Sequence, residues 1–457
     1  MDKRFPLEDQ IVMLATALRG RVITPRDASY NATRALVAAN YDTHPAAVIC
    51  VADVADVGTA LNFARATGLE LAIRSGGHSI FGGTNGGLVI DLRALNSIEI
   101  DAVAGTAWCG TGLTAGEVTK AVEQHGLIVG FGDTASVGIG GLTAGGGIGY
   151  LVRKHGLTID SVLAAEVVTA GGDVVIADAE HYPDLFWAVR GGGGNFGVVT
   201  RWKYRLHPLP HFTGGPLVLP ATPEVVAGFV AAAEAAPEEL SAIATVMRAP
   251  PMPFLPEELH GQVVFFCMMA FAGAPDAAEA ALAPFRSLAV PHADLVGPAP
   301  YSSLYAPEQP GAPLPSFAVR SRLTNEFGIE EARILIEQVS RSDAMLPLGE
   351  IRVLGGAMSR VPADATAFAH RDARYQVSFI AILDNPADVP RHSVWAQEGI
   401  EAIRHGADRV YVNFIVCDKA DRRGAAWPAA TWERLRRIKR VYDPENLFRR
   451  NQNVPPA

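Results

Sequence analysis

The sequence predicts an α+β protein of two domains. Its 457 residues exceed the usual size of one hydrophobic core. Residues 45–51, 54–67 and 71–74 have the patterns of a strand, a helix and a second strand. The composition changes at residues 207–210, His-Pro-Leu-Pro, and the chain beyond them is richer in proline and alanine. We therefore expect a second domain to begin at this point.

The same periodicities predict the remaining elements. Helical spacing recurs in four further segments, residues 7–20, 114–125, 183–189 and 431–442. Strand patterns occur at residues 88–92, 97–100, 160–169, 173–177, 198–206, 262–270, 351–358, 374–383 and 410–416. Residues 160–177 predict a β-hairpin around Gly171 and Gly172, and residues 198–206 alternate so that one face of the strand is charged.

The composition limits the partners of the protein. Hydrophobic residues make up 49% and charged residues 19% of the chain, which is typical of a globular protein. The formal net charge of −9, with Lys and Arg scattered, makes nucleic acid and anionic membranes unsuitable partners. No apolar run reaches the about 18 residues of a membrane span, and no signal-peptide pattern opens the chain.

The cysteines predict the compartment. Four are spread through the sequence, at Cys50, Cys109, Cys267 and Cys417. None of them forms a metal-binding pair. We expect free thiols in a reducing compartment, and therefore a cytoplasmic protein without a bound metal.

Glycine is concentrated in a few segments. Glycine, with 45 residues in the chain, clusters at residues 76–87, 138–149, 171–172 and 191–197, which suggests main chain packed against a ligand. Residues 192–197 match the letters of the dinucleotide fingerprint, but a helix precedes them and a strand follows. That order is the reverse of a Rossmann unit and argues against a nicotinamide-dependent reductase. A phosphate-binding nest or packing against a flat ligand fits better.

The stretch at residues 76–79, Gly-Gly-His-Ser, places one imidazole on a turn with little side-chain bulk around it. His78 could bind a metal, move a proton or bond to a cofactor, and a capping or core histidine is the alternative. Three other histidines lack a partner at ligand spacing: His155, His181 and His207. No Gly-x-Ser-x-Gly elbow supports a serine hydrolase.

Four motifs occur together in one order. They are Arg-Ser-Gly-Gly-His-Ser at 74–79, the glycine-rich run at 138–149, Arg-Gly-Gly-Gly-Gly-Asn-Phe-Gly-Val-Val-Thr at 190–200, and Tyr-Asp-Pro-Glu-Asn-Leu-Phe-Arg-Arg-Asn-Gln-Asn at 442–453. This set resembles the berberine bridge enzyme-like branch of the vanillyl-alcohol oxidase flavoproteins, of the bacterial 6-hydroxynicotine oxidase type. The resemblance covers residues 30–208 and 365–456.

The resemblance implies a discontinuous fold. A PCMH-type FAD-binding domain would combine residues 1–208 with residues 417–457. A substrate domain of residues 209–416 would be inserted between them, with an antiparallel sheet backed by helices. The flavin ring would lie at the junction of the two domains, a common place for a pocket.

The resemblance also implies the cofactor-binding residues. His78 would bond covalently to the 8α-methyl group of FAD. Main-chain amides of residues 74–79 and 138–143 would hold the pyrophosphate without a basic side chain. Residues 195–199 would line the adenosine side, and the C-terminal residues 451 and 452 would close over the cofactor. The full set besides His78 is Arg74, Ser75, Gly76, Gly77, Ser79, Thr134, Val137, Gly138, Gly140, Gly141, Thr143, Gly147, Asn195, Gly197, Val199, Asn451 and Gln452.

Two positions in this set refine the chemistry that the resemblance implies. Thr134 occupies the place where many relatives have a cysteine that forms a second flavin link, and threonine cannot form a thioether. We therefore expect FAD attached only through His78. Val137 occupies the gatekeeper position, where a small β-branched side chain is associated with oxidases and a leucine with dehydrogenases.

The catalytic residues are harder to assign. Tyrosines that relatives use are replaced by Ile80, Ile148 and Phe414. The remaining candidates are Tyr411, Tyr150 and Asn413, and either tyrosine could instead be structural. Polar residues nearby in sequence are Arg360, His370 and Arg371.

The expected reaction is a hydride transfer from a small heterocyclic or aromatic substrate to flavin N5, followed by reoxidation with O2 to H2O2. Amine oxidation needs no strong general base when it starts from the neutral amine, so the loss of phenols favours an amine over an alcohol. A dehydrogenase with a non-oxygen acceptor and a flavin-binding protein without turnover are the alternatives. A homodimer is compatible with the sequence.

Overall fold

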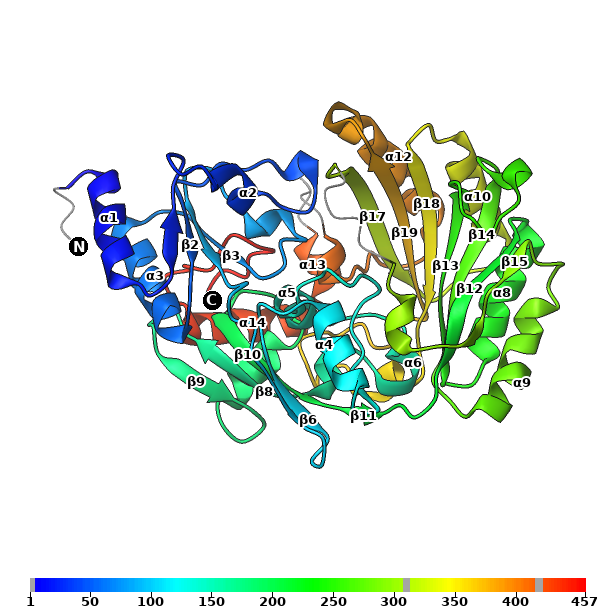
Figure 1. The fold of residues 1–457 in the computed structure, drawn as a ribbon, viewed down its shortest axis with the longest axis horizontal. Helices are drawn as coiled ribbons and strands as arrows, with labels where there is room; N and C mark the ends of the chain where they lie inside the picture. The colour runs from blue at the N-terminus through cyan, green and yellow to red at the C-terminus, as the bar shows by residue number, and fades with distance from the viewer. Residues whose placement is uncertain (1–4, 307–312, 416–421) are drawn as a thin grey trace.

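The computed structural model describes residues 5–306, 313–415 and 422–457. The chain folds into two halves, and the first and last described elements, α1 and α14, lie in the half that holds β2, β3, β6 and β10 (Figure 1). A large twisted sheet forms the other half. The predicted α+β class is confirmed. No helix in these described ranges is long and apolar enough to cross a membrane.

The first sheet has the order β1-β2-β4-β3, with β2, β4 and β3 parallel and β1 antiparallel. Its strands are β1 (Arg21–Ile23), β2 (Ala47–Cys50), β3 (Leu71–Arg74) and β4 (Leu88–Asp91). The crossover helix α3 (Val54–Thr67) starts where the Asp53 side chain accepts a hydrogen bond from the Asp56 amide, and ends at Gly68, whose φ is +72°. The predicted strand–helix–strand unit is confirmed.

The second sheet is antiparallel, with the order β5-β6-β10-β8-β9. Its strands are β5 (Ile98–Asp101), β6 (Thr106–Gly110), β8 (Val162–Val168), β9 (Val174–Ala177) and β10 (Val198–Arg205). Trp202 and Tyr204 on β10 are fully buried, while Arg201 and Lys203, which alternate with them, are partly exposed, as predicted. A two-stranded ribbon joins β7 (Leu127–Ile128) to β11 (His207–Pro208). The β8–β9 hairpin is also confirmed.

The third sheet has eight antiparallel strands and covers residues 213–383. They are β12 (Thr213–Pro220), β13 (Leu240–Arg248), β14 (Val263–Phe271), β15 (Ala293–Asp294), β16 (Gly297–Pro298), β17 (Ser316–Thr324), β18 (Leu346–Val353) and β19 (Tyr375–Leu383). Helices α8 (Pro223–Ala235), α10 (Ile329–Arg341) and α12 (Val389–Ala402) contact its strands, and α9 (Pro275–Arg286) packs beside α8 (Figure 1). An apolar core between sheet and helices holds these elements together, with Phe229, Phe265 and Phe379 fully buried.

The remaining helices lie around the junction and the ends of the chain. They are α1 (Leu7–Ala17), α2 (Tyr30–Arg34), α4 (Ala115–Glu123), α5 (Ile139–Gly145), α6 (Val152–His155), α7 (Pro183–Val189), α11 (Ala357–Arg360), α13 (Arg423–Ala426) and α14 (Ala429–Tyr442). Arg153 on α6 crosses the junction, and its guanidinium donates to the carbonyls of Leu354 and Ala236 at 2.9 and 2.8 Å. These buried bonds fix the large sheet against the other half.

Two predicted strands are wrong in part. The strand expected at 351–358 is β18, which ends at Val353 because Gly355 and Gly356 follow at φ of +93° and +58°, and residues 357–360 form α11 instead. The strand expected at 410–416 is a single 3-10 turn, Val412–Phe414, which packs beside the edge strand β17 without joining the sheet. Tyr411 therefore reaches its position from a turn and not from the inserted sheet. Residue 416 and Cys417 lie outside the described residues.

Candidate active site

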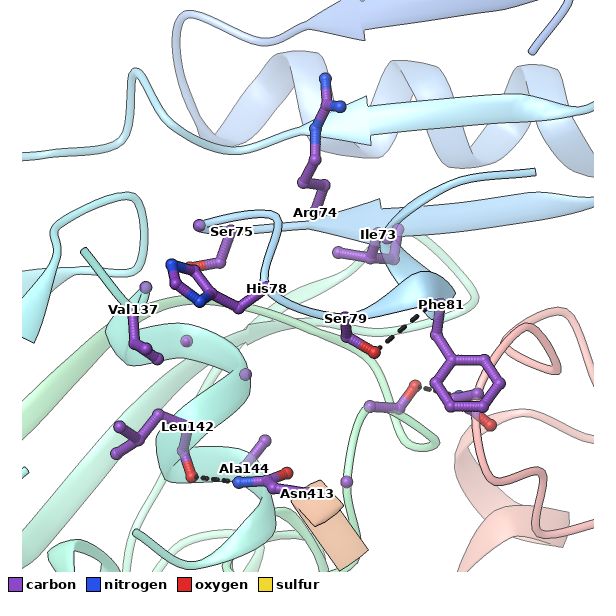
Figure 2. Close-up of a pocket in the computed structure, with 18 of the residues that line it drawn as sticks. Ile73, Arg74, Ser75, His78, Ser79, Phe81, Val137, Leu142, Ala144 and Asn413 are labelled. Atoms are coloured by element: carbon purple, nitrogen blue, oxygen red, sulfur yellow. Dashed lines mark hydrogen bonds between the residues drawn. The ribbon is translucent and has the colours of Figure 1, made fainter. Parts of the chain in front are cut away.

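A cavity of about 430 Å³ lies at the junction of the two halves. Its walls come from the loop after β3, the segment that leads into α5, the glycine-rich turn before β10, strand β18, the 3-10 turn at 412–414 and the C-terminal segment 448–452. Figure 2 shows the side chains of several of these segments directed toward one another. Segments that are distant in sequence thus share one site.

Two glycine-containing loops form one wall by main-chain contact. A Cβ on Gly76 would overlap the main chain of Gly138, and a Cβ on Gly138 would overlap the Gly76 nitrogen. Gly77 has φ of +80°, which favours glycine. The glycines at these positions are therefore needed for the approach of the two loops. The cavity receives main chain here in place of side chains.

Arg74 contributes its main chain to the cavity and not its charge. Its guanidinium donates to the Asp91 carboxylate at 2.7 Å and to the Thr33 carbonyl at 2.6 Å, and it is buried. Figure 2 shows the side chain pointing away from the other labelled residues. The charge of Arg74 is therefore paired with Asp91 and is directed away from the cavity.

The cavity has open space for a ligand and an unsatisfied polar atom in its wall. An added Cβ on Gly141 or Gly194, both in the cavity wall, would meet no protein atom within 4 Å, so each faces open space. Asn451 also lines the cavity, and its buried Oδ1 has no hydrogen-bond partner within the described part of the chain. Its Nδ2 donates to the Gly194 carbonyl at 2.9 Å, which fixes the amide in place. A ligand donor would satisfy the orphaned oxygen.

His78 lines this cavity and is half-buried. Figure 2 shows its imidazole on the same side of the site as Val137, which precedes α5. Thr134 also lines the cavity, and its hydroxyl donates to the Asp133 carboxylate at 3.2 Å. His78, Thr134 and Val137 therefore line the same cavity.

The structure brings most of the predicted site residues to the cavity. Those in its wall are Arg74, Ser75, Gly76, Gly77, His78, Ser79, Thr134, Val137, Gly138, Gly140, Gly141, Gly197, Val199, Tyr411, Asn413, Asn451 and Gln452.

Four predicted residues lie behind the wall. The Thr143 hydroxyl shares a 2.7 Å hydrogen bond with Tyr204, and the Gly147 amide donates to Tyr411 at 2.7 Å. The Asn195 side chain accepts from the Val454 amide at 3.0 Å and donates to the Gly192 carbonyl at 2.9 Å, so it holds the C-terminal segment in place. Tyr150 is buried in the hydrophobic core, which is the structural alternative for that residue.

Tyr411 is held as a neutral phenol. Its oxygen accepts hydrogen bonds from the Gly147 amide and from Asn413 Nδ2, both at 2.7 Å. Burial raises the pKa of Tyr411 to about 12, although both hydrogen bonds act in the opposite direction. Asn413 is itself fixed, because its Nδ2 also donates to the Leu142 carbonyl at 3.0 Å. The phenol is thus arranged to donate a hydrogen bond and not to serve as a base at neutral pH.

Sequence reasoning missed a charged group in the cavity. The Arg352 guanidinium contacts the Asp133 carboxylate at 2.6 Å through Nη2 and the Glu350 carboxylate at 2.8 Å through Nε. Asp133 and Arg352 line the cavity, and Glu350 is buried beside them. The available signals were the position of Asp133 directly before Thr134 and the two-residue spacing of Glu350 and Arg352, which puts both on one face of a strand.

The polar residues that sequence proximity had suggested do not line the cavity. Arg360 pairs with Glu238 on the surface. His370 shares a hydrogen bond with the Ala425 carbonyl at 2.7 Å, and Arg371 pairs with Asp160 at 2.7 Å. These contacts account for all three side chains as structural.

Comparison with known proteins gives the class. The FAD binding domain family matches residues 45–178, and the "Berberine and berberine like" family matches residues 410–455. A crystal structure of 6-hydroxy-D-nicotine oxidase from Arthrobacter nicotinovorans superimposes with a TM-score of 0.85 at 26% identity, and the match covers 96% of this chain and 98% of that one. The fold is that of an FAD-dependent oxidoreductase.

Sequence relatives over the full chain give the family. The FAD-linked oxidoreductase YgaK of Bacillus subtilis is 30% identical, and the match covers 97% of this chain and 98% of that protein. The (R)-6-hydroxynicotine oxidase of Paenarthrobacter nicotinovorans is 29% identical over the same shares of the two chains. The chain belongs to the berberine bridge enzyme-like family of FAD-linked oxidoreductases.

Proposed function

We propose that this protein is an FAD-dependent oxidase that oxidises a small heterocyclic or aromatic amine or alcohol, with O2 as the final electron acceptor and H2O2 as a product. FAD, when bound, supplies the acceptor for the substrate hydride. The observation that carries the proposal is the cavity in which His78, Val137 and the main chain of two glycine-containing loops face one space.

We propose that residues 1–208 and 417–457 hold the cofactor and that residues 209–416 supply the substrate domain. His78 would be the single covalent attachment, since Thr134 has no thiol. Main-chain amides of residues 75–79 and 138–141 would hold the pyrophosphate. Gly197 and Val199 would lie along the adenosine side, and Asn451 and Gln452 would close the site.

The chain's own side chains would orient the substrate. Tyr411 would donate a hydrogen bond from its neutral phenol, and Asn413 would keep that phenol in place. Val137, Ile148 and Phe414 give the cavity apolar surface for an aromatic or heterocyclic ring. The sequence comparison and the structure comparison both find an oxidase named for 6-hydroxynicotine, which supports a nitrogen heterocycle and favours C–N over C–O oxidation.

The test is anaerobic mixing of the purified holoenzyme with a panel of aromatic amines and matched alcohols. We expect flavin bleaching with at least one amine, then rapid recovery and H2O2 formation on admission of air. Slow recovery would favour a dehydrogenase, which is the second candidate. No bleaching with any compound would favour a flavin-binding protein without turnover.

We further propose a cytoplasmic location, which is supported by three unpaired thiols, Cys50, Cys109 and Cys267. Fractionation of cells that express the protein tests this. A homodimer in solution is also proposed, and sedimentation of the purified holoenzyme tests it.

A further inference from the structure

The charged group at the cavity consists of Asp133, Arg352 and Glu350, which we call the substrate-side charge cluster. Arg352 is 5% exposed, and Glu350 is 8% exposed. The Arg352 guanidinium also donates to the Ile148 carbonyl at 3.3 Å and lies over the Phe414 ring at 5.3 Å. Four contacts therefore fix one guanidinium at the cavity wall. Such a buried and ordered arrangement is typical of a recognition site.

The cluster is short of one positive charge. Two carboxylates share a single guanidinium, so the fully ionised cluster carries one net negative charge. Tyr411 and Tyr150 nearby stay neutral, because burial raises the pKa of both phenols. The other arginines of the cavity wall are committed elsewhere: Arg74 pairs with Asp91, and Arg450 donates to the Gly83 carbonyl at 3.0 Å. Burial raises the pKa of Glu350, whereas Arg352 favours its charged form. The carboxylate charge that a ligand can reach is that of Asp133, and a cationic donor would compensate it.

Asp133 is the member that the cavity can reach. Its side chain is 27% exposed, whereas those of Arg352 and Glu350 are 6% and 10% exposed. One carboxylate oxygen, Oδ2, accepts from Arg352, and the other, Oδ1, accepts only the Thr134 hydroxyl at 3.2 Å within the described residues. The Oδ1 lone pairs therefore have room for another donor.

We propose that the substrate binds as a protonated amine, with its ammonium group on Asp133, while Arg352 and Glu350 position that carboxylate. This inference rests on the proposed function and narrows its substrate class. Asp133 is then a substrate-binding residue that can also accept the ammonium proton. Arg352 and Glu350 are positioning residues. The neutral amine that the sequence favoured would form in the site and not before binding.

An anionic substrate fits the cluster less well. A carboxylate would have to approach Arg352, whose Nε and Nη2 already donate to Glu350 and Asp133. It would also approach two like charges, whose repulsion grows in a site of low dielectric. The geometry therefore favours a cationic substrate over an anionic one.

Three flat probes of nearly equal shape test this charge preference without turnover: benzamidine, benzamide and benzoate, which are cationic, neutral and anionic at pH 7.5. Each is titrated into oxidised holoenzyme, and the dissociation constant is measured by calorimetry and by the change in flavin absorbance. We expect benzamidine to bind at least about tenfold more tightly than benzoate, a difference in affinity of about 1.4 kcal/mol.

Substitutions test which residue causes the preference for benzamidine over benzoate. Asp133→Asn should bring benzamidine and benzoate within about threefold of each other while leaving benzamide binding unchanged. Glu350→Gln keeps the Asp133–Arg352 pair and should reduce the preference by a smaller factor, since Glu350 does not reach the cavity. Glu99→Gln removes a surface carboxylate that is paired with Arg201, and it should change nothing.

Tighter binding of benzoate than benzamidine would overturn the inference, as would an unchanged preference in Asp133→Asn. The benzamide affinity and the flavin absorbance show whether each variant is still folded and loaded. Because the measurements use oxidised enzyme and inert probes, their result is independent of whether the protein proves to be an oxidase, a dehydrogenase or a flavin-binding protein.

Discussion

The two ends of the cavity are built in opposite ways. At the proposed cofactor end, Gly76, Gly77 and Gly138 bring main chain to the wall, and Arg74 turns its charge away. At the proposed substrate end, Arg352 and Asp133 bring charged side chains to it. Main-chain amides are suited to binding a cofactor, because the cofactor is the same molecule in every turnover. Charged side chains can change between relatives without disturbing the backbone, so the substrate end is where specificity can vary.

Removal of the proposed tether should have the largest effect. His78→Ala is expected to abolish covalent retention of flavin completely, because Thr134 cannot provide a second bond. Yellow colour and fluorescence should then leave the protein on acid precipitation, whereas they should stay with wild type and with Thr134→Ala. Flavin that stays bound to His78→Ala would contradict single attachment.

Removal of the guanidinium at the substrate end should destabilise the fold. Arg352→Met would leave the buried Glu350 and the partly exposed Asp133 near each other without a partner, and we expect a loss of about 3–5 kcal/mol in unfolding free energy. Urea unfolding measures it. Arg360→Met is the control, because that arginine pairs with Glu238 on the surface, and it should cost less than about 1 kcal/mol. Adding Glu350→Gln to Arg352→Met should restore part of the loss.

Substitution of two glycines distinguishes a glycine needed for packing of the protein from a glycine that leaves room for a ligand. Gly76→Ala should cost about 1–3 kcal/mol even without flavin, because the new Cβ would overlap the main chain of Gly138. Gly141→Ala should leave apoprotein stability nearly unchanged and lower flavin content, since only open space surrounds it. Thermal unfolding of apoprotein and the ratio of flavin to protein absorbance check both. Equal flavin loading in Gly141→Ala and wild type would show that the cofactor lies elsewhere.

The smallest expected effect concerns the phenol. Tyr411→Phe should lower kcat by about tenfold or less, since it removes one hydrogen-bond donor. A pKa raised to about 12 keeps the phenol protonated through pH 10, so the pH profile of kcat/KM between pH 6 and 10 should be the same in both proteins. If kcat/KM of the variant no longer fell at the acidic or the alkaline end of the profile, Tyr411 would instead be a residue that gains or loses a proton during catalysis.

Sequence reasoning worked where the determinants are local. The unit around α3 follows from apolar spacing, the Asp53 cap and the Gly68 stop, and the glycine motifs report their own backbone needs. It failed at residues 410–416, where an apolar run that resembles a strand forms a 3-10 turn beside the edge strand β17 and does not join the sheet. It also missed the ion pair of Asp133 with Arg352, because 219 positions separate the two residues and only the folded sheet brings them together.

The C-terminal segment has a consequence for how the protein matures. Asn451 and Gln452 line the cavity, Gln452 Nε2 donates to the Val412 and Ile415 carbonyls at 3.3 and 3.1 Å, and Asn195 holds Val454. During synthesis, the glycine-rich motifs are therefore made before the segment that completes the cavity wall. A chain that lacks residues 451 and 452 would lack part of the cavity wall, so flavin would be retained only once this segment is synthesised and docked.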